Sequence, residues 1–215
     1  MDNSIIQNLR HEYEAEELNE QSISKDPIIQ FGKWFQDAVN AGTPEPNAMT
    51  LATANVDFKP SARIVLLKGI EEGGFVFFTN YNSRKGKELL WNPYATLLFF
   101  WAEVHRQIRI EGRVIKISPE ASENYFRSRP DGSRLGAFIS PQSEVIENRK
   151  FLEDKLAEAE RKFANTDVPR PEHWGGYKLI PNQIEFWQGR PNRLHDRLLY
   201  TLVDQDQWKI ERLAP

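Results

Sequence analysis

The sequence predicts a β-dominated α+β fold, in which antiparallel strands form a barrel with helices around it. From Ala48 to Ile117, short runs rich in β-branched and aromatic residues are separated by turn residues. Helical patterns do not alternate regularly with these runs, whereas a parallel doubly wound sheet needs a crossover helix after nearly every strand. The glycine-rich motifs GxGxxG and GxxxxGK[ST] are absent. Any phosphate ligand must therefore be bound in another way.

The composition favours one domain with a substantial core. Hydrophobic residues make up 40% of the 215 residues and aromatic residues 12%, which is enough apolar material to exclude a disordered chain. Residues 1–25 are polar, with apolar residues only roughly at helical spacing, so we expect a mobile N-terminal arm there. Residues 26–215 are expected to form a single domain.

Charge and cysteine content exclude several functional classes. A formal net charge of -3 gives no overall attraction to nucleic acid or to an anionic membrane, so we expect neither partner. No apolar run is long enough to span a bilayer. The absence of cysteine excludes disulfides and thiolate chemistry, and it makes the cytoplasm the expected compartment.

Capping residues predict where the helices begin. Asp26 followed by Pro27 is typical of a helix start, and the apolar stripe that follows ends at Gly42. The same chemistry predicts further helices after Ser83, after Ser118 and from Ser143 to Lys162. The final strands are expected at 174–180, 183–188, 196–203 and 207–213.

Two basic segments are candidates for anion sites. The run RIVLLK begins with Arg63 and ends with Lys68, and period-2 alternation places the two cations on opposite faces of a strand, where they could serve two ligands or simply reach solvent. The segment 79–87 enters a helix with Arg84, Lys85 and Lys87 in its first turn. One interpretation is a simple solvated helix start, but cations at a helix N-terminus oppose the helix dipole. The other interpretation, a phosphate cradle, is therefore equally favoured.

Two further groups could contact a ligand. Tyr125, Arg129 and Ser133 follow one another at steps of four, which suits a phosphate but also arises by chance on surfaces. Near the C-terminus, a strand that carries Trp187 turns and returns with Arg193, His195 and Arg197 at alternate positions. These three would share one face of the returning strand and would repel one another unless an anion or a carboxylate lies among them. His105 is expected to be an ordinary surface or turn residue, and no spacing suits a metal ion, so no metal is expected.

The C-terminal segment resembles a known family. IEFWQ at 184–188, followed by four residues and RLHDR at 193–197, resembles the signature of the pyridoxamine (pyridoxine) 5′-phosphate oxidases. RIVLLK, TNYNSRKG, RQIRIEG, YFRSRP, PQS, WGGY and WKIERLAP resemble the same family in the same order, from about Ala48 to the end. RHEY at 10–13 resembles the arm that covers the substrate in that family.

The resemblance implies an FMN-binding split β-barrel of the Greek-key type that acts as a homodimer, with two active sites at the subunit interface, each built from both chains. It implies an enzyme of vitamin B6 cofactor synthesis, which oxidises pyridoxamine or pyridoxine 5′-phosphate to pyridoxal 5′-phosphate with dioxygen as acceptor. Hydrogen peroxide is released, together with ammonia from the amine.

The family's site residues map onto this sequence position by position. The implied FMN contacts are Arg63, Ile64, Val65, Leu66, Leu67, Lys68, Phe78, Thr79, Arg84, Lys85, Gln107, Gln142, Ser143, Trp187 and Arg197. The implied substrate contacts are Arg10, His11, Glu12, Tyr13, Lys68, Tyr125, Arg129, Ser133, Arg193, Leu194 and His195. Among these, Arg193 and His195 are the implied catalytic residues: Arg193 holds the substrate ring and stabilises developing charge, and His195 orients the substrate and could relay a proton.

Small departures and alternatives remain at this point. Phe78 stands where the family usually has Tyr, His105 stands where we would expect an acid, and Arg190 adds a cation of open role. The alternatives are a flavin reductase or FMN electron-transfer protein of the same barrel architecture, and a non-catalytic carrier of FMN or pyridoxal phosphate. The first alternative would need the flavin contacts but not the substrate contacts, and the second would tolerate the loss of Arg193 and His195.

Overall fold

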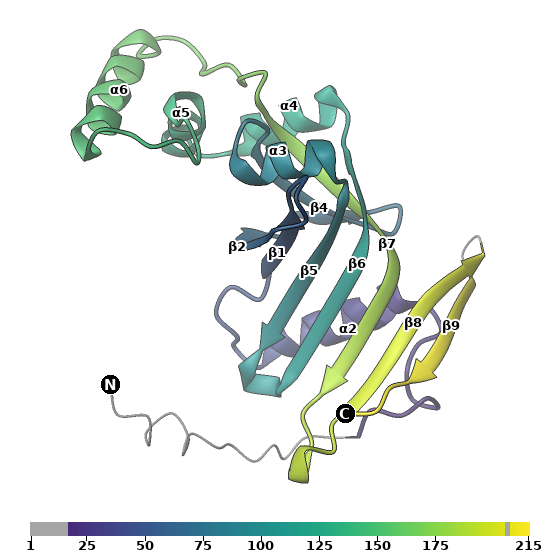
Figure 1. The fold of residues 1–215 in the computed structure, drawn as a ribbon. Coiled ribbons are helices and arrows are strands. Elements are labelled where there is room, and N and C mark those ends of the chain that lie inside the picture. The colour runs from purple at the N-terminus through teal and green to yellow at the C-terminus, as the bar shows by residue number, and fades with distance from the viewer. Residues whose placement is uncertain (1–16, 205–206) are drawn as a thin grey trace, which may run out of the picture. The chain divides into compact units, whose positions relative to one another are not determined.

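The computed structural model describes residues 17–204 and 207–215 (Figure 1). The predicted substrate-covering residues 10–13 lie outside this part of the chain. The helices are α2 (Pro27–Asn40), α3 (Arg84–Trp91), η1 (Ala102–Val104), α4 (Pro119–Ser128), α5 (Asp131–Ile139), α6 (Arg149–Lys162) and η2 (Pro191–Arg193). The strands are β1 (Ala48–Ala54), β2 (Pro60–Leu66), β3 (Gly69–Glu71), β4 (Gly74–Asn80), β5 (Tyr94–Trp101), β6 (Arg106–Lys116), β7 (Trp174–Gln188), β8 (Asp196–Asp204) and β9 (Gln207–Arg212).

The strands follow the order β2-β1-β5-β6-β7-β4-β3, with β8 paired to β7 and β9 paired to β8. Pairs β3/β4, β4/β7, β7/β8 and β8/β9 are antiparallel. Strand β7 combines two of the strands predicted separately from the sequence. It pairs with β4 as far as Leu179 and with β8 from Gln183 onward, and Pro181, which has no N–H to donate, lies between the two registers.

The described chain divides into two compact units. Unit 1 comprises the described residues up to Met49, with Leu97–Glu111 and Pro181–Pro215; unit 2 comprises Thr50–Thr96 and Gly112–Ile180. Strands β1, β5, β6 and β7 contribute residues to both. The expectation that residues 26–215 form one domain stays a prediction.

The core of unit 1 is aromatic. From α2, Phe31 contacts Phe99 edge to face with 5.2 Å between ring centroids, and Trp34 contacts Phe186 in the same way at 5.2 Å. Phe186 in turn contacts Tyr200, whose hydroxyl donates to the carbonyl of Ser24 at 2.6 Å. Phe31 and Trp34 of the predicted apolar stripe are therefore buried, whereas Ile29 and Val39 are exposed, and Asp26 caps this helix as expected.

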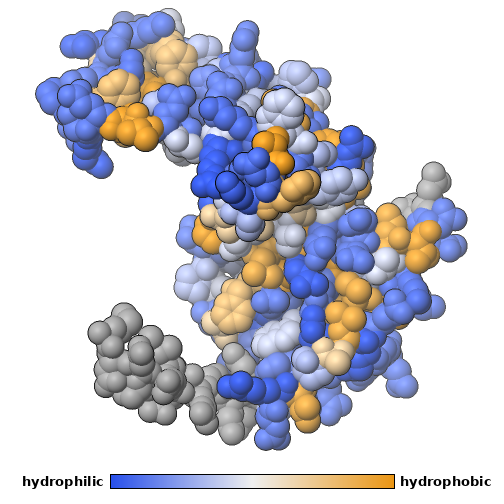
Figure 2. Space-filling view, in the orientation of Figure 1, coloured by the Kyte–Doolittle hydropathy of each residue, from blue (hydrophilic) through white to orange (hydrophobic). Residues whose placement is uncertain are grey.

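The core of unit 2 lies around β4 and the first half of β7. Phe75, Phe77 and Leu179 are fully buried there. A second cluster of Phe126, Val168 and Trp174 fixes α4 and α5 beside these strands. On the face drawn in Figure 2, hydrophilic residues cover most of the surface and apolar residues lie scattered among them. Within the described ranges, no helix is both long and apolar enough to cross a membrane.

The predicted helix starts at Ser83 and Ser118 are confirmed, because both side chains accept a hydrogen bond from the first turn. The predicted start at Ser143 is wrong. Ser143 has a positive φ of 74°, in a turn closed by the N–H of Glu144 and the carbonyl of Pro141, and α6 begins only after Asn148, whose side chain caps Phe151. The five residues 143–147, before that cap, therefore stay outside the helix.

Candidate functional site

A cavity of about 510 Å³ in unit 2 brings together many of the residues predicted to contact a ligand. Eleven of the lining residues belong to that predicted set: Ile64, Val65, Leu66, Lys68, Phe78, Thr79, Lys85, Tyr125, Arg129, Ser133 and Gln142. They come from β2, β4, α3, α4, α5 and the segments that connect them. The sequence thus predicted a group of residues that the fold brings together.

Lys68 lines this cavity, although the reasoning that led to it needs correction. Strand β2 ends at Leu66, so the alternation of strand faces does not reach Lys68. Its backbone N–H donates to the carbonyl of Val76 at 2.8 Å, which fixes the connector beside β4. Arg63 is not among the lining residues of the cavity, so the two cations do serve different surroundings.

Arg129 is the cation that most clearly awaits a partner. Arg129 is the C-cap of α4 and has an extended backbone. The guanidinium carbon of Arg129 lies 4.7 Å from the centroid of the Trp174 ring. Ser133 belongs to α5, a helix that was not predicted from the sequence. Arg129 Nη1 is buried and has no hydrogen-bond partner among the described residues. Burial lowers the pKa of Arg129, so an anion in the cavity would find a poorly solvated cation.

Aromatic rings form the wall beside Arg129. Phe78 and Tyr125 stack with 3.8 Å between ring centroids, and Phe78 also stacks on Trp174 at 5.5 Å. Phe78 contributes its ring to this stack, so the tyrosine that the family usually has at this position would add only a hydroxyl. The stack holds Tyr125 from α4 against β4 and orients that side of the cavity.

Lys85 also lines the cavity, where its ammonium lies among neutral oxygens. Its ammonium donates to Thr79 Oγ1 at 3.1 Å, to Gln142 Oε1 at 3.0 Å and to Ser83 Oγ at 3.5 Å. Burial and the charge of Arg63 lower the pKa of Lys85 to about 8, although Glu88 opposes this. A buried cation with only neutral acceptors attracts an anionic group.

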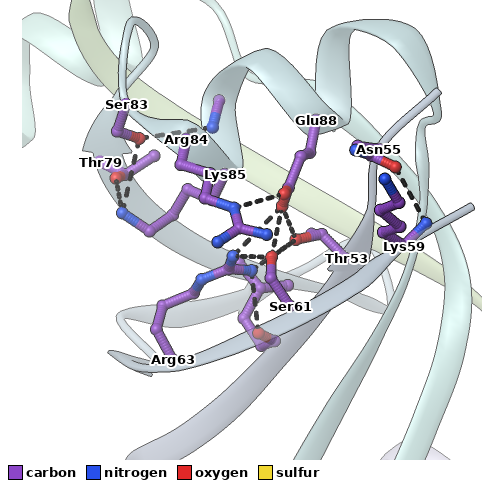
Figure 3. A network of polar contacts seen from close by, with 12 residues as sticks. Thr53, Asn55, Lys59, Ser61, Arg63, Thr79, Ser83, Arg84, Lys85 and Glu88 are labelled. Carbon is purple, nitrogen blue, oxygen red and sulfur yellow. Dashed lines mark hydrogen bonds and ion pairs between the residues drawn. The ribbon is translucent and has the colours of Figure 1, made fainter. Parts of the chain in front are cut away.

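Glu88 is a functional candidate that the sequence analysis missed (Figure 3). Its carboxylate is almost fully buried and accepts from Arg84 at 2.9 Å and from Arg63 at 3.2 Å. Thr53 and Ser61 donate to the same carboxylate. Burial raises the pKa of Glu88, but these four hydrogen bonds outweigh it and lower the pKa to about 2. On the sequence, Glu88 is only an ordinary helix partner of Arg84 at i,i+4, so no signal marked it as buried.

Arg84 and Ser143 line a second cavity, of about 620 Å³, which lies in the same unit. Gln142 lines both cavities. The remaining member of the predicted flavin-binding run, Leu67, is buried in the core, and Gln107 lies on β6 within unit 1.

Unit 1 holds the other predicted residues. Trp187 lies near the end of β7, and its ring is 4.6 Å from the imidazole of His195. Arg197 pairs with the buried Glu185 at 2.7 Å and donates to the carbonyl of Ala214 at 2.8 Å. Arg109 pairs with the other oxygen of Glu185 at 2.8 Å. Glu185 is thus the carboxylate that balances Arg197, and the sequence did not identify it.

The prediction that Arg193, His195 and Arg197 share one strand face is wrong. Strand β8 begins at Asp196, and Arg193 closes the short helix η2. Asn192 and Arg193 both have positive φ, 59° and 61°, so the chain curls here rather than extending. Arg193 and Leu194 are exposed, and His195 is half-buried. His105 is a turn residue as expected, with a φ of 52°.

Comparisons with known proteins agree on one family. A family model described as "Pyridoxamine 5'-phosphate oxidase" matches residues 35–163, and one described as "Pyridoxine 5'-phosphate oxidase C-terminal dimerisation region" matches residues 174–215. The chain is 57% identical over 215 residues to a pyridoxine/pyridoxamine 5′-phosphate oxidase of Trichormus variabilis, with 100% of both chains covered. It is 57% identical over 208 residues to the protein of the same description from Paraburkholderia phytofirmans, covering 96% of this chain and 97% of the relative.

Solved structures confirm the expected split-barrel fold class. PhzG from Burkholderia lata 383, in complex with tetrahydrophenazine-1-carboxylic acid, matches with a TM-score of 0.87 and 31% identity, covering 94% of this chain and 99% of that one. A pyridoxamine 5′-phosphate oxidase-related, FMN binding protein from Nostoc punctiforme matches with a TM-score of 0.69, covering 85% of this chain and 96% of that one. At 20% identity, this second likeness concerns the fold alone.

Proposed function

Because this chain belongs to the pyridoxamine 5′-phosphate oxidase family, we propose that it oxidises pyridoxamine or pyridoxine 5′-phosphate to pyridoxal 5′-phosphate. Dioxygen is the final acceptor and hydrogen peroxide the second product, with ammonia released from the amine. FMN is the cofactor; when bound, it supplies the hydride acceptor and passes the electrons to dioxygen.

One observation carries the choice of a phosphorylated substrate. Lys68, Tyr125, Arg129 and Ser133 all line the 510 Å³ cavity, and Arg129 Nη1 is buried without a partner among the described residues. Two cations and two hydroxyls suit the three oxygens of a phosphate group. These four side chains therefore hold the substrate phosphate, and the remaining cavity takes the pyridine ring.

The chain also offers groups that fit the FMN phosphate. Lys85, Thr79 and Gln142 form one hydrogen-bonded cluster, with the first turn of α3 and Arg84 beside it. Free N–H groups of a helix start and a buried ammonium bind phosphate together. Lys85 would bind the FMN phosphate together with these groups, while Glu88 holds Arg63 in place.

The protein acts as a homodimer, in keeping with the match of residues 174–215 to a dimerisation region. The residues of unit 1 supply the remaining contacts to flavin and substrate. We place the two active sites at the subunit interface, each built from both chains. Trp187 and Arg197 hold the flavin. Arg193 holds the substrate ring and stabilises developing charge, and His195 orients the substrate. The cytoplasm stays the predicted compartment.

The deciding experiment is an anaerobic spectrum of the yellow holoenzyme. Adding pyridoxamine 5′-phosphate should bleach the flavin absorbance, and admitting air should restore it with one hydrogen peroxide per substrate. Unphosphorylated pyridoxamine is the control, since it lacks the group that Arg129 and Lys68 hold. The ligand in the PhzG structure, tetrahydrophenazine-1-carboxylic acid, is a tricyclic carboxylic acid without a phosphate. Adding such an acid in place of the B6 phosphate tests whether this chain oxidises a substrate of that kind. Bleaching by NADPH and not by either B6 phosphate would instead establish a flavin reductase and defeat the proposal.

A further inference from the structure

The loop between β7 and β8 holds His195 in one orientation. At its start, Gly189 donates from its backbone N–H to the carbonyl of His105 at 2.8 Å, and Gln188 Nε2 donates to the same carbonyl at 3.1 Å. At its end, the imidazole lies against the Trp187 ring. Between these points, the backbone N–H of Arg190 donates to His195 Nδ1 at 3.1 Å. The ring is thus fixed on one face by Trp187 and at one nitrogen by the backbone.

That hydrogen bond also decides which nitrogen carries the proton. A backbone N–H can only donate, so Nδ1 must be the acceptor and a neutral imidazole has its hydrogen on Nε2. An imidazolium would turn a second N–H toward Arg190. Burial and the charge of the neighbouring Arg193 lower the pKa of His195, which also favours the neutral imidazole. Asp196 belongs to the ion pairs of Arg190 and Arg212.

The side chain of Arg190 holds the donating N–H in place. Its guanidinium lies between Glu17 Oε1, at 3.2 Å, and Asp196 Oδ2, at 3.6 Å. Asp196 in turn accepts from the backbone N–H of Leu18 at 3.2 Å and pairs with Arg212 at 2.7 Å. The start of the described chain, β8 and β9 are therefore all joined to the residue that contacts His195.

From this geometry we infer that His195 is a neutral Nε2–H imidazole that donates a hydrogen bond to the substrate and does not take a proton from it, with Arg190 as its positioning residue. The contact with substrate rests on the proposed function, whereas the tautomer does not. The role that sequence reasoning left open for Arg190 is thereby assigned, and of the two roles considered for His195 the orienting one remains.

The tautomer can be measured directly by nitrogen NMR on ¹⁵N-histidine-labelled holoenzyme. The chain has only four histidines, and a His195→Gln sample assigns the signal. At pH 7 we expect a protonated Nε2 and an unprotonated Nδ1. A proton on Nδ1, or an imidazolium at pH 7, would overturn the inference, even if the wild-type protein produced peroxide from pyridoxamine 5′-phosphate.

Kinetics of two variants test the donor role. Glutamine places an amide N–H near the Nε2 position, whereas asparagine places its amide near Nδ1. We expect kcat of His195→Gln to stay within about tenfold of wild type and kcat of His195→Asn to fall about 100-fold, the usual effect of losing one catalytic donor. The fall of kcat/KM at acidic pH should also remain in His195→Gln, because His195 is not the group that takes a proton. Equal losses in the two variants, or disappearance of that fall, would show a proton acceptor instead.

Arg190 is tested separately through the same signal. Arg190→Gln removes the ion pairs with Glu17 and Asp196 but keeps the backbone N–H. We expect a mixture of His195 tautomers and a several-fold lower kcat/KM, both restored by Arg190→Lys. An unchanged tautomer signal in Arg190→Gln would exclude the positioning role of the side chain.

Discussion

Lys85 Nζ lies 3.0 Å from Gln142 Oε1, so a buried ammonium faces a neutral amide oxygen in the cavity that both residues line. Burial and Arg63 together lower the pKa of Lys85 to about 8. A lysine with a lowered pKa disfavours the folded state below that pH, and this unfavourable contribution disappears as pH rises from about 8 to the ordinary lysine value. The same titration should govern the binding of an anion.

We expect FMN affinity to be highest below pH 8 and to fall above it, by up to about tenfold per pH unit, because the neutral amine no longer attracts phosphate. Flavin fluorescence titration of the apoprotein between pH 6.5 and 9.5 measures this. Lys85→Arg should remove the dependence, since arginine keeps its charge throughout. Riboflavin, which lacks the phosphate, should show no such slope; a slope for riboflavin equal to that for FMN would place the titrating group elsewhere.

Glu88→Gln should destabilise the apoprotein by about 1–3 kcal/mol, because Arg63 and Arg84 lose their shared carboxylate in a buried setting. Because the pKa of Glu88 is lowered to about 2, its stabilisation is present above pH 4.5 and is lost as pH falls toward 2. Urea unfolding at pH 7 and pH 3 measures both effects, and the difference between wild type and variant should shrink at the lower pH.

Glu153→Gln is the matched control for Glu88→Gln. Glu153 also follows an arginine, Arg149, by four residues on a helix, but both side chains are exposed. Its replacement should change the free energy of unfolding by less than about 0.5 kcal/mol. Equal effects of the two substitutions would mean that the burial of Glu88 contributes nothing.

Arg129→Leu should raise KM for pyridoxamine 5′-phosphate by about 10- to 100-fold, the effect of losing a charge-assisted hydrogen bond, while FMN content stays unchanged. Steady-state peroxide production and the absorbance ratio of flavin to protein give the two readouts. Arg127→Leu serves as control, because Arg127 is exposed and pairs only at the surface with Glu123. A KM shift shared by both variants would contradict the assignment.

Arg193→Leu should lower turnover far more than FMN content, because Arg193 is placed at the substrate and not at the cofactor. Arg193 has a φ of 61°, a backbone conformation that strains leucine as well as arginine and that asparagine adopts more readily. Arg193→Asn tolerates that backbone and should lose the same turnover; normal turnover in Arg193→Asn would attribute the leucine result to strain. Equal loss of turnover and FMN in Arg193→Leu, or loss of neither, would also defeat the assignment.

Local chemistry explains which elements the sequence could predict. Asp26, Ser83 and Ser118 each cap a helix through their own side chain, so the nearby residues alone determine those starts. Ser143 has the same capping chemistry but lies in a turn, because Asn148 caps α6 instead. Two capping residues within six positions cannot be ranked from the sequence.

The site residues divide in a similar way. Lys85 and Arg129 were found from the local charge pattern and again through resemblance to a family, whereas Gln142 was found through the resemblance alone, and all three line one cavity. Glu88 and Glu185 were missed because a carboxylate is ordinarily exposed, and only the tertiary structure buries them among arginines. The curl at Asn192 was missed because alternate spacing is typical of a strand whether or not the backbone is extended there.

The ion pairs of Glu88 also affect how the chain folds before flavin binds. The carboxylate balances Arg63 and Arg84 from inside the protein, so these cations require no external anion while the polypeptide folds. Flavin phosphate is therefore not needed to neutralise Arg63 and Arg84 during folding, whereas the buried charge of Lys85 still disfavours the folded apoprotein until an anion binds.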